Sequence, residues 1–194
     1  MGAKMMKLLL HSCCGPCSTY PVKVLKEDSI DITSFWYNPN IHPYTEYKNR
    51  YETYRKFMED ENIPVIVKNE YGLREFVKNV CNMEEPRCKY CYDVRFELLA
   101  KTAKEKGFDA FSTTLLVSPY QNHDLIIKIA EEKSEKYGVD FYYRDFRVGF
   151  REGQQIAREL GMYMQKYCGC IFSEEERYAK QIKRDKEQNN YQLN

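Results

Sequence analysis

The chain has 194 residues, of which 43% are hydrophobic and 30% are charged, and this length and composition predict one globular domain. No apolar run approaches the roughly 18 residues that a membrane span needs, and the first residues lack the long apolar segment of a secretory signal, so we expect a cytoplasmic protein. The formal net charge of +1 excludes a globally basic nucleic-acid-binding protein, although a local basic patch is compatible with it.

The first part of the chain alternates predicted strands with predicted helices. The apolar run at 7–11 predicts a buried strand, and Gly15 and Pro16 separate it from a helix that we expect over 18–28. Further strands are predicted at 32–37 and 64–67, and further helices at 44–61 and 73–80. The helix at 44–61 carries a tyrosine-rich stripe at helical spacing, which we expect to face the core.

The second part continues this alternation. A helix begins near the Cys88-x2-Cys91 motif and ends at Gly107, and strands are predicted at 108–113 and 139–143. Helices are predicted at 123–137 and 154–160, and a helical tail at 173–194 that Ser173 caps. Together, the elements predict a single α/β domain over 1–194, a Rossmann-like three-layer sandwich with a mostly parallel sheet and its site at the carboxyl edge of the strands.

Eight cysteines fall into three groups along the chain: Cys13, Cys14 and Cys17; Cys81, Cys88 and Cys91; Cys168 and Cys170. Without an export signal, such grouping favours metal binding or redox chemistry over a framework of structural disulfides. The first group follows the first strand, where a helix N-terminus is expected to lower thiol pKa values.

Two of these groups together supply a candidate metal centre. If the loops carrying Cys13-Cys14 and Cys88-x2-Cys91 lie side by side, four thiolates can close around zinc or a 4Fe–4S cluster. Adjacent cysteines are awkward ligands for a single zinc ion, because consecutive side chains diverge. This geometry favours the cluster.

Two other interpretations of the thiols remain open. Cys14-Gly15-Pro16-Cys17 is typical of a thioredoxin-like thiol–disulfide oxidoreductase, although the neighbouring thiol of Cys13 argues against it. The alternative is a zinc-stabilised tRNA-binding or protein-binding module without catalysis. Cys168-Gly169-Cys170 can form only a small, strained disulfide ring, which suits a redox role; the alternatives are two more ligands or inert thiols.

Several other residues are candidates for the site. Asp93 could act as an acid or as a ligand of a second metal beside Cys17, or simply as a carboxylate in the first turn of its helix. His11, His42 and His123 could each be catalytic or structural. The chain has neither a P-loop motif nor a glycine-rich dinucleotide motif, so no nucleotide site of those kinds is indicated.

Five segments of the chain resemble one known family, the QueH-type epoxyqueuosine reductases. They are LLLHSCCGPCS at 8–18, WYNPNIHP at 36–43, RCKYCY at 87–92, TTLLVSPYQ at 113–121 and YCGCIFS at 167–173. The matches run in order across nearly the whole chain. The family removes the epoxide oxygen of epoxyqueuosine at the wobble position of tRNA, which is the last step of queuosine biosynthesis.

The resemblance implies an oxidoreductase with a 4Fe–4S cluster and a redox-active disulfide, and it leaves open an additional mononuclear iron near Cys17 and Asp93. It assigns the cluster to Cys13, Cys14, Cys88 and Cys91, and the redox-active pair to Cys168 and Cys170. It also implies a fold related to the Rossmann-like nucleotide hydrolases and tRNA-thiolation proteins, with cluster ligands in place of the ATP loop.

The implied partners are an electron donor and the anticodon loop of a tRNA that carries epoxyqueuosine, with no membrane involved. Stacking on aromatic rings and phosphate contacts from basic residues are the usual means of holding single-stranded RNA. Candidates in or near loops are Tyr37, His42, Tyr44, Tyr120, Arg147 and Arg151.

Overall fold

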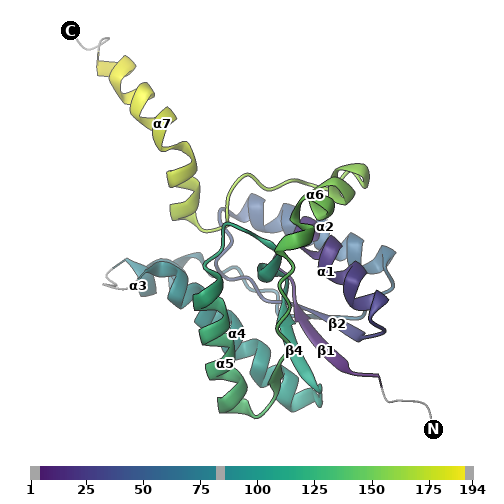
Figure 1. The fold of residues 1–194 in the computed structure, drawn as a ribbon. Helices are drawn as coiled ribbons and strands as arrows, with labels where there is room; N and C mark the ends of the chain where they lie inside the picture. Colours follow the sequence, from purple (N-terminus) through teal and green to yellow (C-terminus); the bar gives the residue numbers. More distant parts are fainter. Residues whose placement is uncertain (1–4, 82–85, 191–194) are drawn as a thin grey trace.

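A five-stranded, all-parallel sheet forms the centre of the computed structural model, which describes residues 5–81 and 86–190 without the side chains of 189 and 190 (Figure 1). The strand order is β3-β2-β1-β4-β5, and every neighbouring pair is parallel. The predicted α/β class and parallel sheet are therefore confirmed. Residues 191–194 of the predicted tail lie outside the described residues.

The helices and strands follow the predicted alternation closely. In chain order they are β1 (Lys7–His11), α1 (Gly15–Glu27), β2 (Asp31–Trp36), α2 (Tyr44–Asp60), β3 (Val65–Val67), α3 (Leu73–Val80), α4 (Arg87–Lys106), β4 (Ala110–Thr113), η1 (Thr114–Val117), α5 (His123–Tyr137), β5 (Asp140–Phe141), η2 (Arg147–Gly149), α6 (Phe150–Glu159) and α7 (Ile171–Asn190).

Helices cover both faces of the sheet, as the right-handed crossover rule requires. The chain moves outward from β1 through β2 to β3, with α1 and α2 on one face, and α6 packs against α1. It then returns across the sheet to β4 and β5, so that α4 and α5 pack together on the other face (Figure 1). Within the described ranges, no helix combines the length and apolar character that crossing a membrane requires.

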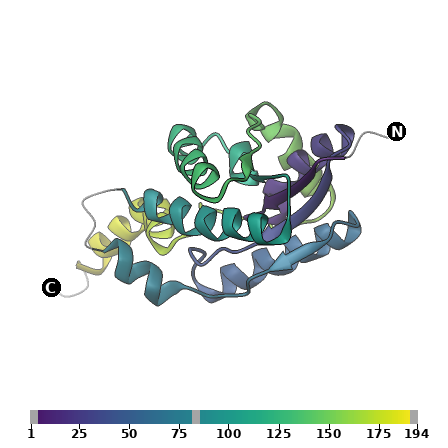
Figure 2. The same ribbon diagram turned by 90° about the horizontal axis from the view of Figure 1, so that it is seen from below.

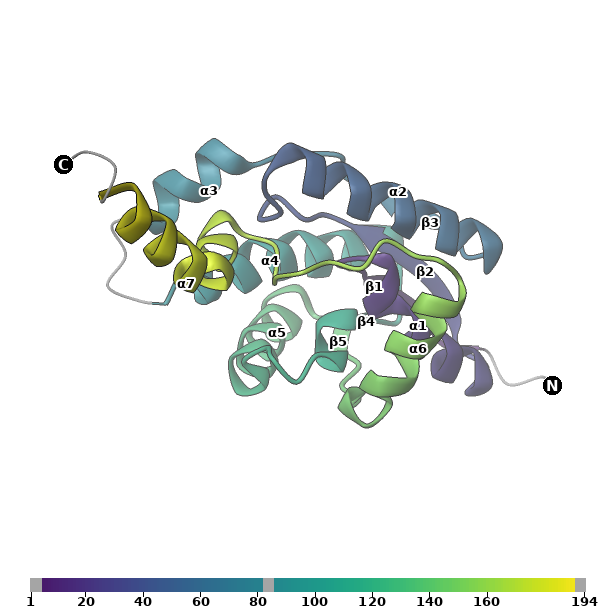
Figure 3. The same ribbon diagram turned by 90° about the horizontal axis from the view of Figure 1, so that it is seen from above.

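The last helix lies apart from this sandwich. Figures 2 and 3 show the start of α7 beside α3 and the start of α4, at the end of the molecule away from the N-terminus. Arg87 of α4 and Glu176 of α7 form an ion pair of 2.6 Å there. The segment between α6 and α7 crosses the molecule above β1 and α1 (Figure 3).

The tyrosine-rich stripe of α2 faces the core, as predicted. Tyr47 and Tyr54 are buried, and both rings contact Trp36 of β2, with ring centroids 5.8 and 4.9 Å from it. Each buried hydroxyl has a partner: Tyr47 accepts from the Trp36 indole nitrogen, and Tyr54 donates to Ser34. These bonds let tyrosine occupy core positions at little cost, since buried polar groups must be paired.

Three helices begin earlier than the sequence predicts, and the predicted capping role of Ser173 is wrong. The helix α1 begins at Gly15, because proline is well tolerated in the first turn and Cys14 caps the helix through its sulfur. Likewise, α7 begins at Ile171, since the Ser173 N–H donates to Cys170 Sγ and so lies within the first turn. The third, α6, begins at Phe150.

The connections on the two sides of β1 leave in opposite directions, because β1 lies between β2 and β4. In open α/β sheets, ligands bind at the carboxyl ends of the strands where the order reverses in this way. Here the carboxyl ends of β1 and β4 place Cys13 and Thr114 side by side, with the Cys13 N–H donating to Thr114 Oγ1 at 3.3 Å.

Candidate active site

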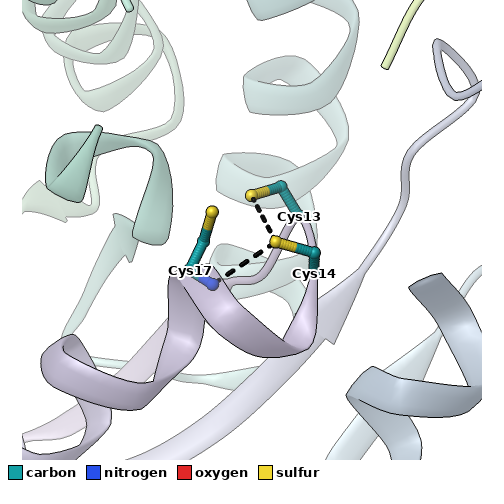
Figure 4. A group of neighbouring side chains, drawn as sticks. All are labelled: Cys13, Cys14 and Cys17. Carbon is teal, nitrogen blue, oxygen red and sulfur yellow. Dashed lines mark hydrogen bonds between the residues drawn. The ribbon is translucent and has the colours of Figure 1, made fainter. Parts of the chain in front are cut away.

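Three thiols meet at this edge of the sheet. Cys13 follows β1, Cys14 caps α1, and Cys17 lies in the first turn of α1, so one tight turn gathers all three. Their sulfur atoms lie within 4.8 Å of one another, and all three residues are buried (Figure 4). We call Cys13, Cys14 and Cys17 the thiol trio.

Two side chains from distant parts of the chain donate hydrogen bonds to the trio. Thr114 Oγ1 lies 3.7 Å from Cys13 Sγ. The amide nitrogen of Gln165, in the segment between α6 and α7, lies 3.0 Å from Cys14 Sγ and 3.4 Å from Cys17 Sγ. Nothing in the local sequence around Gln165 singles it out, because only the path of this segment over the sheet brings it to the thiols.

The three thiols of the trio differ in acidity. Hydrogen bonds from Cys14 and Cys17 hold the pKa of Cys13 well below its ordinary value. Burial raises the pKa of Cys14, and the hydrogen bond to Cys13 raises that of Cys17. The expectation that the helix N-terminus lowers the pKa of these thiols is therefore wrong for Cys14 and Cys17, since desolvation and neighbouring thiols outweigh the helix dipole.

The trio has the donor chemistry of a soft metal centre. Among the described residues, the sulfur atoms of the trio are potential ligands that lie close enough together to hold a metal ion. Thiolates suit zinc and iron–sulfur clusters, and either needs a further ligand to complete four-fold coordination. The trio thus supports a metal centre, and the residues present fit one that is thiolate-bound.

A second group of thiols lies at the start of α4. Cys91 is buried and packs with Cys170, Phe76 and Val80 in a small apolar cluster. Burial is the main cause that raises the pKa of Cys91 to about 12; the charge of Arg95 acts against it, and the neighbouring thiols of Cys168 and Cys170 act with it. The same causes raise the pKa of Cys88. The structure therefore brings the C-x2-C motif next to the C-x-C motif, although neither motif joins the 4.8 Å group of the trio.

The segment that carries Cys168 and Cys170 is fastened to α2 and to the loop before it. Arg50 donates to the carbonyl oxygens of Tyr167 and Cys168, both at 2.9 Å. The backbone N–H of His42 donates to Gly169 O at 2.8 Å, and His42 Nδ1 accepts from the Ile171 N–H at 3.4 Å. These contacts hold the C-x-C motif in place by its backbone.

The two thiols of this motif differ in their surroundings. Cys168 is exposed, and its sulfur accepts a hydrogen bond from Gln121 Nε2 at 3.2 Å. Cys170 is buried, and its sulfur caps α7. Gly169 between them has a φ of +146°, a conformation that side-chain-bearing residues rarely adopt.

His11 and Asp93 are poorly placed to act as acids. Both ring nitrogens of His11 are hydrogen-bonded, to Thr113 on one side and to Tyr37 O and Asn38 on the other. Burial lowers the pKa of His11 to about 3, so the ring is neutral near pH 7. Asp93 forms an ion pair of 2.6 Å with Lys133 of α5 and does not join Cys17 in the trio.

The candidates for RNA contact divide by exposure. Tyr37 and His42, in the loop that follows β2, are buried, and as surface contacts these two predictions are wrong. Tyr44 is 57% exposed and Tyr120 is 84% exposed. Arg151 is also exposed. Arg147 forms an ion pair of 2.6 Å with Asp145, so its charge is partly neutralised.

Two further candidate residues lie away from the trio. The remaining thiol, Cys81, is exposed at the end of α3, and His123 is buried at the start of α5.

The fold and the site together define a Rossmann-like α/β protein whose ligand-binding edge is built from thiols. The chain belongs to the QueH family: the family model described as "Epoxyqueuosine reductase QueH" matches residues 8–176. The family membership makes the chain an enzyme of the oxidoreductase class.

Curated relatives named "Epoxyqueuosine reductase QueH" match over most of the chain. The relative from Dehalococcoides mccartyi is 38% identical over 174 residues, which are 90% of this chain and 96% of that protein. The relative from Thermotoga maritima is 37% identical over 186 residues, with 91% of this chain and 94% of that protein covered.

Solved structures with little sequence similarity share the fold. The U34-tRNA thiolase NcsA from Methanococcus maripaludis, solved with its [4Fe-4S] cluster, matches with a TM-score of 0.61 at 18% identity, covering 88% of this chain and 62% of that chain. A predicted subunit of tRNA methyltransferase from Methanocaldococcus jannaschii matches with a TM-score of 0.52 at 13% identity, covering 80% and 77%. These matches confirm the Rossmann-like architecture.

Proposed function

We propose that this enzyme reduces epoxyqueuosine to queuosine at the wobble position of tRNA. Its family and its relatives carry the name epoxyqueuosine reductase, which supports this proposal. Removal of the epoxide oxygen consumes two electrons and two protons and yields an alkene and water. The observation that carries the proposal is the buried thiol trio at the carboxyl edge of the sheet, because it places metal-binding groups where this fold binds ligands.

The cofactor in this proposal is a 4Fe–4S cluster on Cys13, Cys14, Cys88 and Cys91. When bound, such a cluster supplies electrons one at a time. The close approach of the Cys13 and Cys14 sulfurs, 3.8 Å apart, supports their joint use as ligands. Cys17, the third member of the trio, is then left as a thiol for a second iron.

The proposed redox-active pair is Cys168 and Cys170. Oxidation of two thiols to a disulfide releases two electrons and two protons, which is the requirement of epoxide reduction. The backbone bonds from Arg50 and His42 orient the pair, and the exposed sulfur of Cys168 can meet the external reductant that restores the dithiol.

The substrate base has to be reached in a single-stranded anticodon loop, where stacking and phosphate contacts are the usual means of binding. Tyr44, Tyr120 and Arg151 offer such groups at the surface. A tRNA substrate also implies that the enzyme works in the cytoplasm.

The decisive experiment is anaerobic purification followed by metal analysis. We expect a brown protein with about four irons and four inorganic sulfides per chain. Cys13→Ala and Cys88→Ala should each lose most of the iron, whereas Cys170→Ala should keep it. Wild-type protein that holds zinc or no metal would overturn the proposed mechanism. With the expected result, reduction of epoxyqueuosine-containing tRNA is assayed directly.

The two alternative functions have less support. A thioredoxin-like enzyme has to present its first thiol to another protein's disulfide, whereas Cys14 and Cys17 are both buried. A zinc-stabilised binding module gives no role to the Cys168–Cys170 pair. Stoichiometric zinc that is unchanged by anaerobic handling would favour that module.

A further inference from the structure

Arg95 is a buried cation at the thiol centre. It lies one turn after Cys91 on α4 and is 2% exposed. Its Nε donates to Cys91 O at 2.8 Å, its Nη2 donates to Cys91 Sγ at 3.1 Å, and its guanidinium lies 5.6 Å from the centre of the Tyr92 ring. The side chain is thus aimed at the sulfur of a proposed cluster ligand.

No carboxylate pairs with Arg95 in the parts of the chain that the structure describes. Arg50 provides the contrast, since it is also 2% exposed but forms an ion pair of 2.6 Å with Glu46. A buried charge without a counter-ion is costly, so Arg95 needs anionic partners of another kind.

The groups near Arg95 that can become anionic are thiols, because a thiol loses its proton when it binds a metal. Arg95 interacts electrostatically with Cys91, with Cys168 of the C-x-C motif and with Cys13 of the trio. It also opposes protonation of His11, which lies beneath the trio. One guanidinium therefore acts on a proposed cluster ligand from each of the two loops, Cys13 and Cys91.

We propose that Arg95 is the counter-charge of the reducing centre: it positions Cys91 through the bond to its sulfur and favours electron uptake at the thiolate-bound centre. This inference rests on the proposed function. Each electron that enters the centre adds one negative charge, and a fixed positive charge in a dry interior stabilises that reduced form. Hydrogen bonds to ligand sulfurs and nearby charge are established ways in which proteins tune cluster potentials.

The test is a redox titration of anaerobically loaded protein with dithionite, followed by electron paramagnetic resonance. Arg95→Met removes the charge at similar volume, and Arg95→Lys keeps it. Lys101→Met is the matched control, because it removes one positive charge from the exposed face of the same helix. Iron and sulfide are counted for each variant, so that only fully loaded proteins are compared.

We expect Arg95→Met to shift the one-electron equilibrium at least tenfold toward the oxidised form, a fall in potential of about 59 mV. Arg95→Lys should retain most of the wild-type potential, and Lys101→Met should match wild type. An Arg95→Met potential equal to that of wild type would overturn the inference. Absence of a cluster from wild-type protein would instead overturn the proposed function.

Arg95→Lys keeps the inference testable if Arg95→Met does not fold. A loaded Arg95→Lys variant whose one-electron equilibrium shifts tenfold toward the oxidised form contradicts the inference, because its charge is retained. A second readout is the rise in melting temperature on loading the apoprotein, which should be smaller in a neutral Arg95 variant than in wild type, since the attraction between guanidinium and centre is lost. An equal rise contradicts the inference.

Discussion

The side-chain amide of Gln165 donates to Cys14 Sγ at 3.0 Å, although the two residues are 151 positions apart in the chain. The same nitrogen lies 3.4 Å from Cys17 Sγ. The segment between α6 and α7 thereby closes the thiol trio from above and supplies it with a neutral donor. A neutral donor stabilises a thiolate without adding a charge, so replacement of Gln165 by an acid should weaken metal binding by the trio.

We predict that Gln165→Glu lowers the iron content of anaerobically purified protein several-fold. A carboxylate at this position would face sulfur atoms that become thiolates when they bind a metal, and a partly buried repulsion of this kind is weakly screened. Iron per chain is measured by a colorimetric assay. Gln181→Glu, on the exposed surface of α7, is the control and should leave iron unchanged. Full iron content in Gln165→Glu would contradict the prediction.

The C-x-C motif should react asymmetrically. Because Cys168 is exposed while Cys170 is buried and caps α7, iodoacetamide should modify Cys168 about tenfold faster than Cys170 in reduced, anaerobic protein. Peptide mass spectrometry after short exposures gives the two rates. Cys81, exposed at the end of α3 and outside the site, provides the reference rate of an unhindered thiol. Faster modification of Cys170 would show that burial does not control access to this pair.

Stability should depend on pH through His42. Burial lowers the pKa of His42 to about 4, although the hydrogen bond to Pro39 O acts in the opposite direction. The Ile171 N–H donates to Nδ1, so this nitrogen is occupied without a proton. Between pH 6.5 and about 4, the unfolded state therefore binds the proton more readily than the folded state. The free energy of unfolding should be complete above pH 6.5 and fall by up to roughly 3 kcal/mol toward pH 4.

The measurement for His42 is denaturant unfolding at several pH values in wild type and His42→Asn. The asparagine side chain can accept from Ile171 but does not titrate, so this variant should lose the part of the pH dependence that His42 causes. His11 contributes its own part in both proteins, because burial lowers its pKa as well. Identical pH profiles would contradict the assignment to His42.

Gly72→Ala should destabilise the loop on which the C-x-C segment rests. A Cβ at Gly72 would lie 2.6 Å from Pro39 Cβ and 2.8 Å from Pro39 O, the atom that accepts from His42. A backbone oxygen cannot move aside freely, so we expect a loss of about 2 kcal/mol in the free energy of unfolding. The fluorescence of Trp36, the single tryptophan, reports the transition.

Gly107→Ala is the comparison for Gly72→Ala. Its Cβ meets nothing within 4 Å, but its φ is +70°, so its cost should be near 1 kcal/mol and arise from the backbone alone. A Gly72→Ala loss no larger than that of Gly107→Ala would contradict the steric argument.

Much of the fold could be predicted because its signals are local. Apolar runs such as 7–11, helical periodicity in α2, and glycines such as Gly107 and Gly138 at helix ends depend on neighbours in the chain, and the structure confirms them. Helix starts were predicted less well. The sulfur atoms of Cys14 and Cys170 cap α1 and α7. No Ser, Thr, Asp or Asn immediately precedes α1, and Ser173 lies inside the first turn of α7 instead of before it.

The sequence by itself determined the parallel α/β class, the thiols at the carboxyl end of β1 and the resemblance to the QueH family, because these depend on residue type and spacing. Tertiary structure alone decided that Gln165 donates to the trio, that Arg50 holds Tyr167 and Cys168, and that the buried Arg95 side chain donates to Cys91 Sγ. It also turned Asp93 toward Lys133. Apolar patterning is repeated over many residues, so it can be recognised in a short stretch of sequence. A single polar contact between distant segments depends on how the layers pack, and so only the tertiary structure reveals it.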